Sequence, residues 1–194
     1  MRVESYRQPK SSFLALEKDL SMITDLILKN ERLKKLIHYT SRDALRRAKL
    51  TDEQTYELFG KNIKLVPKVK IDPTVLNYVV INFDEFNTNM TNPHFRDNTI
   101  GIDIICHYDQ WHLEDFQLRP YRIAAEIDSM LDGQRLSGIG TLEFAGAVLQ
   151  NWTEEYGGVT LFYRAVHGDE DKKNALNPDT NTDIIENFNE IFNN

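Results

Sequence analysis

The hydrophobic pattern of this chain changes its period between Pro67 and Pro73, and this change limits the folds that are open to it. Before Pro67, apolar residues recur at the spacing of one face of an α-helix. After Pro73 they come in short runs rich in β-branched and aromatic side chains, which are typical of strands. The sequence therefore predicts an α+β fold, with amino-terminal helices followed by a sheet.

Helices are expected throughout the first part of the chain. The segment SSFLALEKDLSMITDLILKN has a helical apolar face, with Ser12 placed to cap its start. The segment TDEQTYELFG is typical of a short helix that Thr51 caps and Gly60 ends. A further helix is expected between them. Its apolar side would consist of Leu33, Leu36, Ile37 and Leu45, with a basic surface near its end formed by Arg42, Arg46, Arg47 and Lys49.

The second part of the chain predicts the order β-β-α-β-β. VLNYVVINF (75–83) and TIGIDIICHY (99–108) are the first two strands, separated by a long polar loop or hairpin tip at 84–98. SGIGTLEFAGAVLQ (137–150) and GVTLFYRAVHG (158–168) form a final hairpin, in which the glycines indicate bulges or close backbone approach. The result is a mixed or antiparallel sheet with one packed helix.

The packed helix lies in LEDFQLRPYRIAAEIDSMLDG (113–133). Pro120 is tolerated in its first turn, and Asp132-Gly133 ends it. The apolar stripe consists of Ile123, Ile127 and Met130, with Ala124 and Leu131 beside it. On the strand before this helix, one face is expected to carry Ile100, Ile102, Ile104 and Cys106.

An acidic, asparagine-rich tail occupies 168–194 and closes with a short amphipathic helix that Asp183 would cap. We therefore expect three regions: a helical extension (1–70), an α+β core domain (71–167) and the tail. The loop is an expected partner contact, and the tail helix would dock either on its own domain or on a neighbouring subunit. These contact residues are Asn89, Met90, Phe95, Arg96, Ile184, Ile185, Phe188, Ile191 and Phe192.

Charge is distributed unevenly along these regions. Residues 1–70 hold 16 Lys/Arg against 9 Asp/Glu, 71–167 hold 5 against 14, and 168–194 hold 2 against 7. This polarity suits subunits that stack basic zone on acidic zone, and equally a solvated basic helical surface. A soluble adaptor whose Arg46 and Arg47 contact nucleic acid is a further interpretation, and it predicts binding that falls steeply with salt.

The segment IGIDIICHYDQWHLEDF (100–116) concentrates the residues that suggest chemistry. A metal site would use His107, Asp109, His112, Glu114 and Asp115, but their spacing does not converge on one point. Cys106 is the only cysteine, so no internal disulfide is possible, and its phase favours a buried residue over a nucleophile. We interpret the segment as a core strand and a polar turn whose Glu114 and Asp115 favour the start of the next helix.

A metal-dependent nuclease is the strongest enzymatic alternative. It would use Asp103, His107, Asp109 and Glu143 on neighbouring strands. No lysine occurs from residue 71 through 171, so the cationic group that such a site needs is missing. We therefore expect no catalytic residue, no metal and no cofactor. No apolar run is long enough to span a bilayer, so we expect a soluble protein that does not bind membranes.

The order of elements from VLNYVVINF through DNTIGIDIICHYDQWHLEDFQLRPYRIAAEIDSML to LSGIGTLEFAGAVLQNWTEEYGGVTLFYRAVHG resembles the tail-terminator and tail-completion proteins of tailed bacteriophages. The resemblance implies a structural virion protein without catalytic residues. Its subunits would form a ring, of six- or twelve-fold symmetry, in the neck that joins portal and head to tail. The longer helical start and the acidic tail also suit a portal-bound head-tail adaptor or a ring protein of a short-tailed phage.

The same resemblance implies partners and a location. The partners would be copies of the same chain, a portal or connector protein and tail proteins, with passing contact with DNA. The protein would be assembled in the host cytoplasm and then reside in the neck or tail of the virion.

Overall fold

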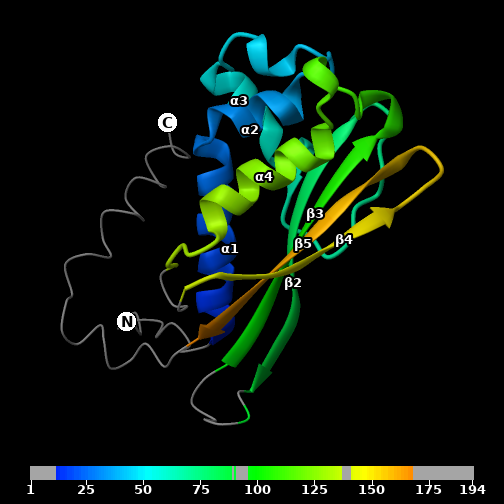
Figure 1. The fold of residues 1–194 in the computed structure, drawn as a ribbon. Helices are drawn as coiled ribbons and strands as arrows, with labels where there is room; N and C mark the ends of the chain where they lie inside the picture. Colours follow the sequence, from blue (N-terminus) through cyan, green and yellow to red (C-terminus); the bar gives the residue numbers. More distant parts are fainter. Residues whose placement is uncertain (1–11, 89, 91–95, 137–140, 168–194) are drawn as a thin grey trace, which may run out of the picture.

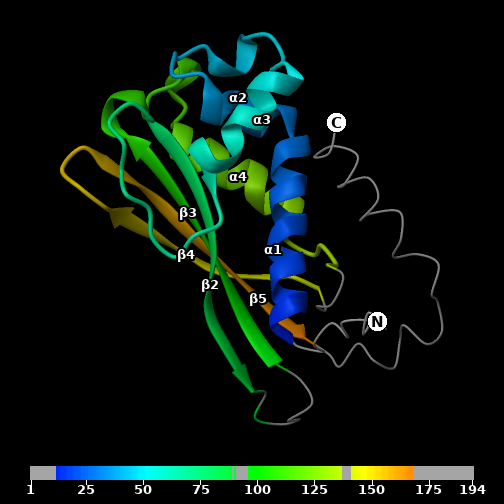
Figure 2. The same ribbon diagram turned by 180° about the vertical axis from the view of Figure 1, so that it is seen from behind.

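The computed structural model describes residues 12–88, 90, 96–136 and 141–167. Its helices are α1 (Ser12–Lys29), α2 (Glu31–His38), α3 (Asp52–Lys61) and α4 (Arg119–Leu131), and its strands are β1 (Ile63–Lys64), β2 (Asn77–Thr88), β3 (Arg96–His107), β4 (Glu143–Asn151) and β5 (Tyr156–His167). Three 3₁₀ turns complete the set: η1 (Ala44–Arg46), η2 (Tyr108–Gln110) and η3 (Glu114–Phe116). Figures 1 and 2 show the helices gathered on one side of the sheet. The predicted α+β class is confirmed.

The sheet has five strands in the order β1-β2-β3-β5-β4. The short strand β1, which the sequence did not predict, pairs parallel with β2, and all other pairs are antiparallel. The predicted order β-β-α-β-β is therefore present with one parallel strand added. Because β5 inserts between β3 and β4, β4 lies at one edge of the sheet (Figure 1).

One hydrophobic cluster joins the helices to the sheet. The predicted inward face of β3 is confirmed, since Ile100, Ile102, Ile104 and Cys106 are all fully buried. From α4 the cluster takes Ile123, Ile127 and Leu131, and from the earlier helices it takes residues such as Ile27 and Leu36. The core thus draws on residues from both sides of the boundary expected at residue 70.

The opposite face of the sheet is covered only in part. A second cluster of Val75, Tyr78, Val80, Ile105 and Tyr156 packs beneath the segment that runs from β1 to β2. That segment contributes Val66, Val69 and Ile71, and Trp152 contributes from the turn between β4 and β5. Toward the other end of the sheet, this face carries the partly exposed Asp103 on β3.

The polar stretch between the first two strands is shorter than expected. β2 continues to Thr88 and β3 begins at Arg96, so most of the predicted loop 84–98 belongs to the paired strands. A register shift between Phe83 and Glu85 lets the hairpin continue past its apolar part. The polar side chains misled the prediction because the β2 residues Asp84, Glu85 and Asn87 at this end of the hairpin are exposed, where strands need no apolar residues.

The caps of the short helices follow the sequence closely. Thr51 and Gln54 form the capping box of α3, and Gly60 ends its regular part with a φ of 80°. Pro120 lies in the first turn of α4, and Gly133 follows its end with a φ of 76°. Ser12 is the first residue of α1, so it lies inside the helix and not at the cap position expected for it.

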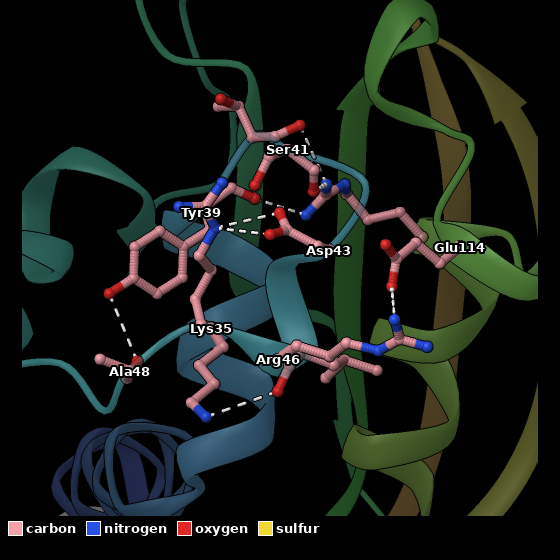
Figure 3. A network of polar contacts seen from close by, with 11 residues as sticks. Lys35, Tyr39, Ser41, Asp43, Arg46, Ala48 and Glu114 are labelled. Atoms are coloured by element: carbon pink, nitrogen blue, oxygen red, sulfur yellow. Dashed lines mark hydrogen bonds and ion pairs between the residues drawn. The ribbon is translucent and has the colours of Figure 1, made fainter.

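The second predicted helix is broken. α2 ends at His38, and Leu45 lies in the separate turn η1 instead of on the same helix. Figure 3 shows the chain that follows α2 folded back over it, with the Lys35 ammonium donating to the Leu45 carbonyl (3.5 Å) and the Tyr39 hydroxyl donating to the Ala48 carbonyl (3.3 Å). The helix stops here because carbonyls at its end and in the chain beyond it accept hydrogen bonds from another partner, a side chain distant in the sequence.

That partner is Arg119, the first residue of α4, which is fully buried. Its guanidinium donates to the carbonyls of Leu36 (2.6 Å), Tyr39 (2.7 Å), Thr40 (3.2 Å), Ser41 (2.9 Å) and Gln110 (2.7 Å). A guanidinium has five N–H donors, and here they meet five carbonyls. The cation also lies at the C-terminus of α2, where the helix dipole favours positive charge.

The acidic residues before α4 do not have their predicted role. Glu114 and Asp115 lie in η3, the first turn of α4 contains no acidic residue, and the helix begins only at Arg119. Instead, Arg46 pairs with Glu114 at 3.0 Å and with Asp115 at 3.5 Å. The ion pairs hold η3 against η1, which sequence spacing alone could not show.

We predict that Arg119→Met destabilises the protein by about 3 to 5 kcal/mol, because five buried or partly buried carbonyls lose their donors. Arg119→Lys should recover only part of this, since an ammonium has three donors and no planar fork. Urea unfolding followed by circular dichroism measures both. Arg164→Met, a change at an exposed arginine of β5, is the control and should alter stability by less than about 0.5 kcal/mol. Equal stability of Arg119→Met and wild type would contradict this role.

Candidate functional site

The residues that suggested chemistry lie at the end of β3 and in the turn after it. The Asp109 amide donates to His107 Nδ1 at 3.2 Å, and the Asp109 carboxylate lies 3.7 Å from the same nitrogen. His112 forms an isolated bridge with Leu118 farther along the chain. Within the described ranges, no group of three or more His, Cys, Asp and Glu side chains is placed to hold a metal ion.

Asp103 projects from the half of the sheet face that the second cluster leaves open. Its carboxylate accepts a hydrogen bond from the Thr160 hydroxyl at 2.6 Å. Partial burial raises the pKa of Asp103, and the nearby Asp84 adds to this, while hydrogen bonds from Thr160 and Asn82 oppose it. This environment describes a carboxylate held by neighbours on the sheet.

The second acid of the nuclease alternative lies far from Asp103. Asp103 is in register with Thr160, which is in register with Val148. Glu143 is in register with Arg164, four residues from Thr160 along β5, or about 13 Å at the rise of a strand. The two carboxylates therefore do not converge on one ion, which disfavours a two-acid metal site at these residues.

Cys106 is part of the core. Its side chain is fully buried on the helix-facing side of β3, and burial raises the pKa of its thiol to about 12. A thiol with that pKa contains almost no thiolate at neutral pH, so it is a poor nucleophile. The sequence interpretation of Cys106 as a buried residue is confirmed.

Of the predicted contact residues, few lie where the structure describes them. Met90, between β2 and β3, has 98% of its surface exposed, and Arg96 begins β3 in register with Thr88 and His167. The others are outside the described residues: Asn89, Phe95, Ile184, Ile185, Phe188, Ile191 and Phe192. The predicted contacts at those positions stay predictions.

Among the described elements, β4 carries the largest number of exposed large apolar side chains, and the sequence interpretation missed this. Every residue of this strand is exposed except Gly146, which is partly buried. Gly146 lies at a bulge and has a φ of 154°. The large apolar side chains are Phe144, Val148 and Leu149, with exposed fractions of 45%, 48% and 59%. We call these three residues the β4 strip.

The β4 strip occupies both sides of the sheet edge. Leu149 is in register with the buried Val159, and the Phe144 ring packs edge-on against Tyr163, so both face the helices. Val148 is in register with Thr160 and faces the other way. On its outer side β4 pairs with no strand of the described chain, and Glu143 is its only charged residue. Soluble proteins usually protect such an edge with charge or proline, and β4 contains one charged residue and no proline.

One signal in the sequence pointed to this strip. EFAGAVLQN is apolar on both faces, as expected of a strand buried inside a sheet, yet the strand order places it at the edge, where it pairs only with β5 among the described strands. Without the strand order, an apolar run cannot be assigned to the centre or the edge of a sheet. The position of β4 therefore had to come from the structure.

We predict that Cys106 does not react with Ellman's reagent at pH 8 in the native protein, because its buried thiol is protonated. In guanidinium chloride the same thiol should react completely within minutes. Absorbance of the released thionitrobenzoate measures both. Rapid labelling of the folded protein would show instead that Cys106 is accessible and would reopen the nucleophile interpretation.

For Asp103 the raised pKa predicts a dependence of stability on pH. The folded pKa lies above that of the unfolded chain, so stability increases as pH falls from neutral into the range in which the folded carboxyl binds its proton. Asp103→Asn removes this dependence and should stabilise the fold slightly at pH 7. Thermal unfolding between pH 4 and 7 measures it, with the exposed Asp109→Asn as control.

Two outcomes would contradict this interpretation of Asp103. A loss of stability at pH 7 in Asp103→Asn would mean that the charge supports the fold. A rise in Tm on adding Mg²⁺, present in the wild type and lost in Asp103→Asn, would favour the hydrolase alternative.

No helix in the described part of the chain has the length and apolar character needed to cross a bilayer.

Among curated proteins, none matches the chain. A family model described as YomW matches residues 30–165, from the N-cap of α2 almost to the end of β5. YomW is a Bacillus phage gene name, and the match indicates a phage-encoded protein. Since the match extends over more than half of the sequence, the chain belongs to the YomW family.

Proposed function

We propose that this protein is a non-enzymatic structural component of a phage virion. It would act as a subunit of an oligomeric ring in the neck, of the tail-terminator or tail-completion type. The observation that carries the proposal is the open β4 edge with its apolar strip, because such an edge suits a subunit that is covered by its neighbour. Membership of a family named after a phage gene supports the phage setting.

The chemistry of the described residues supports a structural role as well. Asp103 and Glu143 are separated along the sheet, and Cys106 is buried with a strongly raised pKa. Large apolar side chains gather instead on an edge strand, where contact between copies can bury them. Burial of apolar area is the main favourable term in stable protein association.

We predict that the full chain forms rings, and that the double variant Val148→Lys/Leu149→Lys is a folded monomer. Both side chains are exposed, so the charges should leave the subunit intact while they prevent burial of the strip. Analytical ultracentrifugation and negative-stain electron microscopy measure the association, and circular dichroism measures the fold. Tyr56→Lys, which places the same charge at an exposed aromatic of α3, is the control and should still assemble.

A wild-type chain that stays monomeric at about 100 μM, alone and with purified portal and tail-tube proteins, would overturn the proposal. Rings that persist unchanged in the double variant would show that the assembly uses another surface.

A further inference from the structure

The turn between η2 and α4 presents one aromatic side chain completely to solvent. Phe116 has an exposed fraction of 102%, the highest among the exposed large apolar residues of the described chain. Asp115 and Phe116 both have left-handed backbone conformations, with φ of 57° and 59°. Asp tolerates this region, but Phe does not favour it, because its Cβ approaches the backbone. The turn therefore holds a Phe where Gly or Asn would fit with less strain.

This strained conformation is fixed by its surroundings. The His112–Leu118 bridge closes the base of the turn, and the Leu113 amide donates to the Gln117 carbonyl at 2.9 Å. The Glu114 amide donates to the Arg42 carbonyl at 3.1 Å, which attaches the turn to the chain that follows α2. Strain that surrounding contacts maintain is often associated with a functional position. Phe116 is thus a rigidly supported projection.

The charges around Phe116 are paired within the molecule. Figure 3 shows Arg46 reaching Glu114, and the same guanidinium lies 3.5 Å from Asp115. On the neighbouring turn, Arg47 pairs with Asp43 at 2.9 Å. Each of these three carboxylates lies within 3.5 Å of an arginine, so most of the charge is compensated locally, and the feature that the turn offers to a partner is mainly apolar. An apolar surface of another protein suits it better than the phosphates of nucleic acid.

We propose that Phe116 is the anchor by which one subunit binds the next, and that it docks on the β4 strip of a second copy of this chain. The inference rests on the proposed ring. A closed ring needs two different surfaces on each subunit, one that projects and one that receives. Phe116 provides the first, and the strip provides the second, with three exposed apolar side chains and a single charged residue on its strand.

A preformed anchor also makes such a contact efficient. The backbone of the turn is already ordered by its hydrogen bonds and ion pairs, so little further entropy is lost when Phe116 is buried. Interfaces commonly depend on a few buried side chains of this kind. The strain at Phe116 is then the local cost of displaying the aromatic ring.

The variant Phe116→Gly separates binding from folding. Glycine adopts a φ of 59° without strain, so thermal stability of the subunit, measured in dilute solution, should be unchanged or higher. The dissociation constant between subunits should rise by a factor of about 30 or more, as measured by analytical ultracentrifugation. Tyr56→Ser, at another exposed aromatic, is the matched control and should change neither.

Mixing two variants tests which surfaces meet. The variant Phe116→Gly retains an unchanged β4 strip, and the variant Val148→Lys/Leu149→Lys retains the Phe116 side chain. Each should be a monomer alone, and a one-to-one mixture should form heterodimers that cannot extend further. Native mass spectrometry distinguishes these species by the mass differences of the substitutions.

The outcomes separate this inference from the ring itself. Rings that form normally from Phe116→Gly would overturn the anchor and leave the ring proposal standing. A mixture that stays monomeric, although Phe116→Gly alone fails to assemble, would show that Phe116 docks elsewhere than on the strip. A wild-type monomer would overturn both proposals.

Discussion

The structure depends on one buried cation. The Arg119 guanidinium meets carbonyls that come from the end of α2, from the chain that follows it and from the turn after β3. Burial lowers the pKa of Arg119, but a guanidinium remains protonated in proteins, so the charge has to be stabilised in place. Backbone dipoles supply this stabilisation without a carboxylate. The amino-terminal helices and α4 are consequently oriented relative to each other by a polar contact as well as by apolar packing.

Other contacts depend on that orientation. With α4 in place, Asp128 accepts a hydrogen bond from the Tyr163 hydroxyl of β5 at 2.9 Å, and Glu126 pairs with Arg32 of α2 at 2.7 Å. Asn30 caps α2 and also donates to Glu126 at 3.3 Å. The first of these bonds links α4 to the sheet, and the other two link α2 to α4. Arg46 of η1 in turn pairs with Glu114 and Asp115 in the turn that carries Phe116.

Local sequence signals predicted the elements, whereas contacts between distant residues decided the rest. Thr51, Gly60 and Gly133 acted through their own backbone preferences, so the caps and stops they mark were predictable. The alternation of Ile100, Ile102 and Ile104 likewise fixed the buried face of β3. The break after His38 was not predictable, because it depends on an arginine some 80 residues farther along the chain. The strip and Phe116 were missed for a related reason, since exposure depends on strand order and on the conformation of a turn.

The strand order has a consequence for the way the chain matures. β3 pairs along its length with β2 on one side and with β5 on the other, yet β5 is the last described strand in the sequence. During synthesis the β2–β3 hairpin can form early, but the inner edge of β3 stays open until residues 156–167 leave the ribosome. Pairings between such distant segments form slowly because a long loop must close first. The pairing of β3 with β5 in the middle of the sheet therefore forms late. Until it forms, a nascent chain exposes the edge of β3 that is paired inside the sheet of the folded subunit.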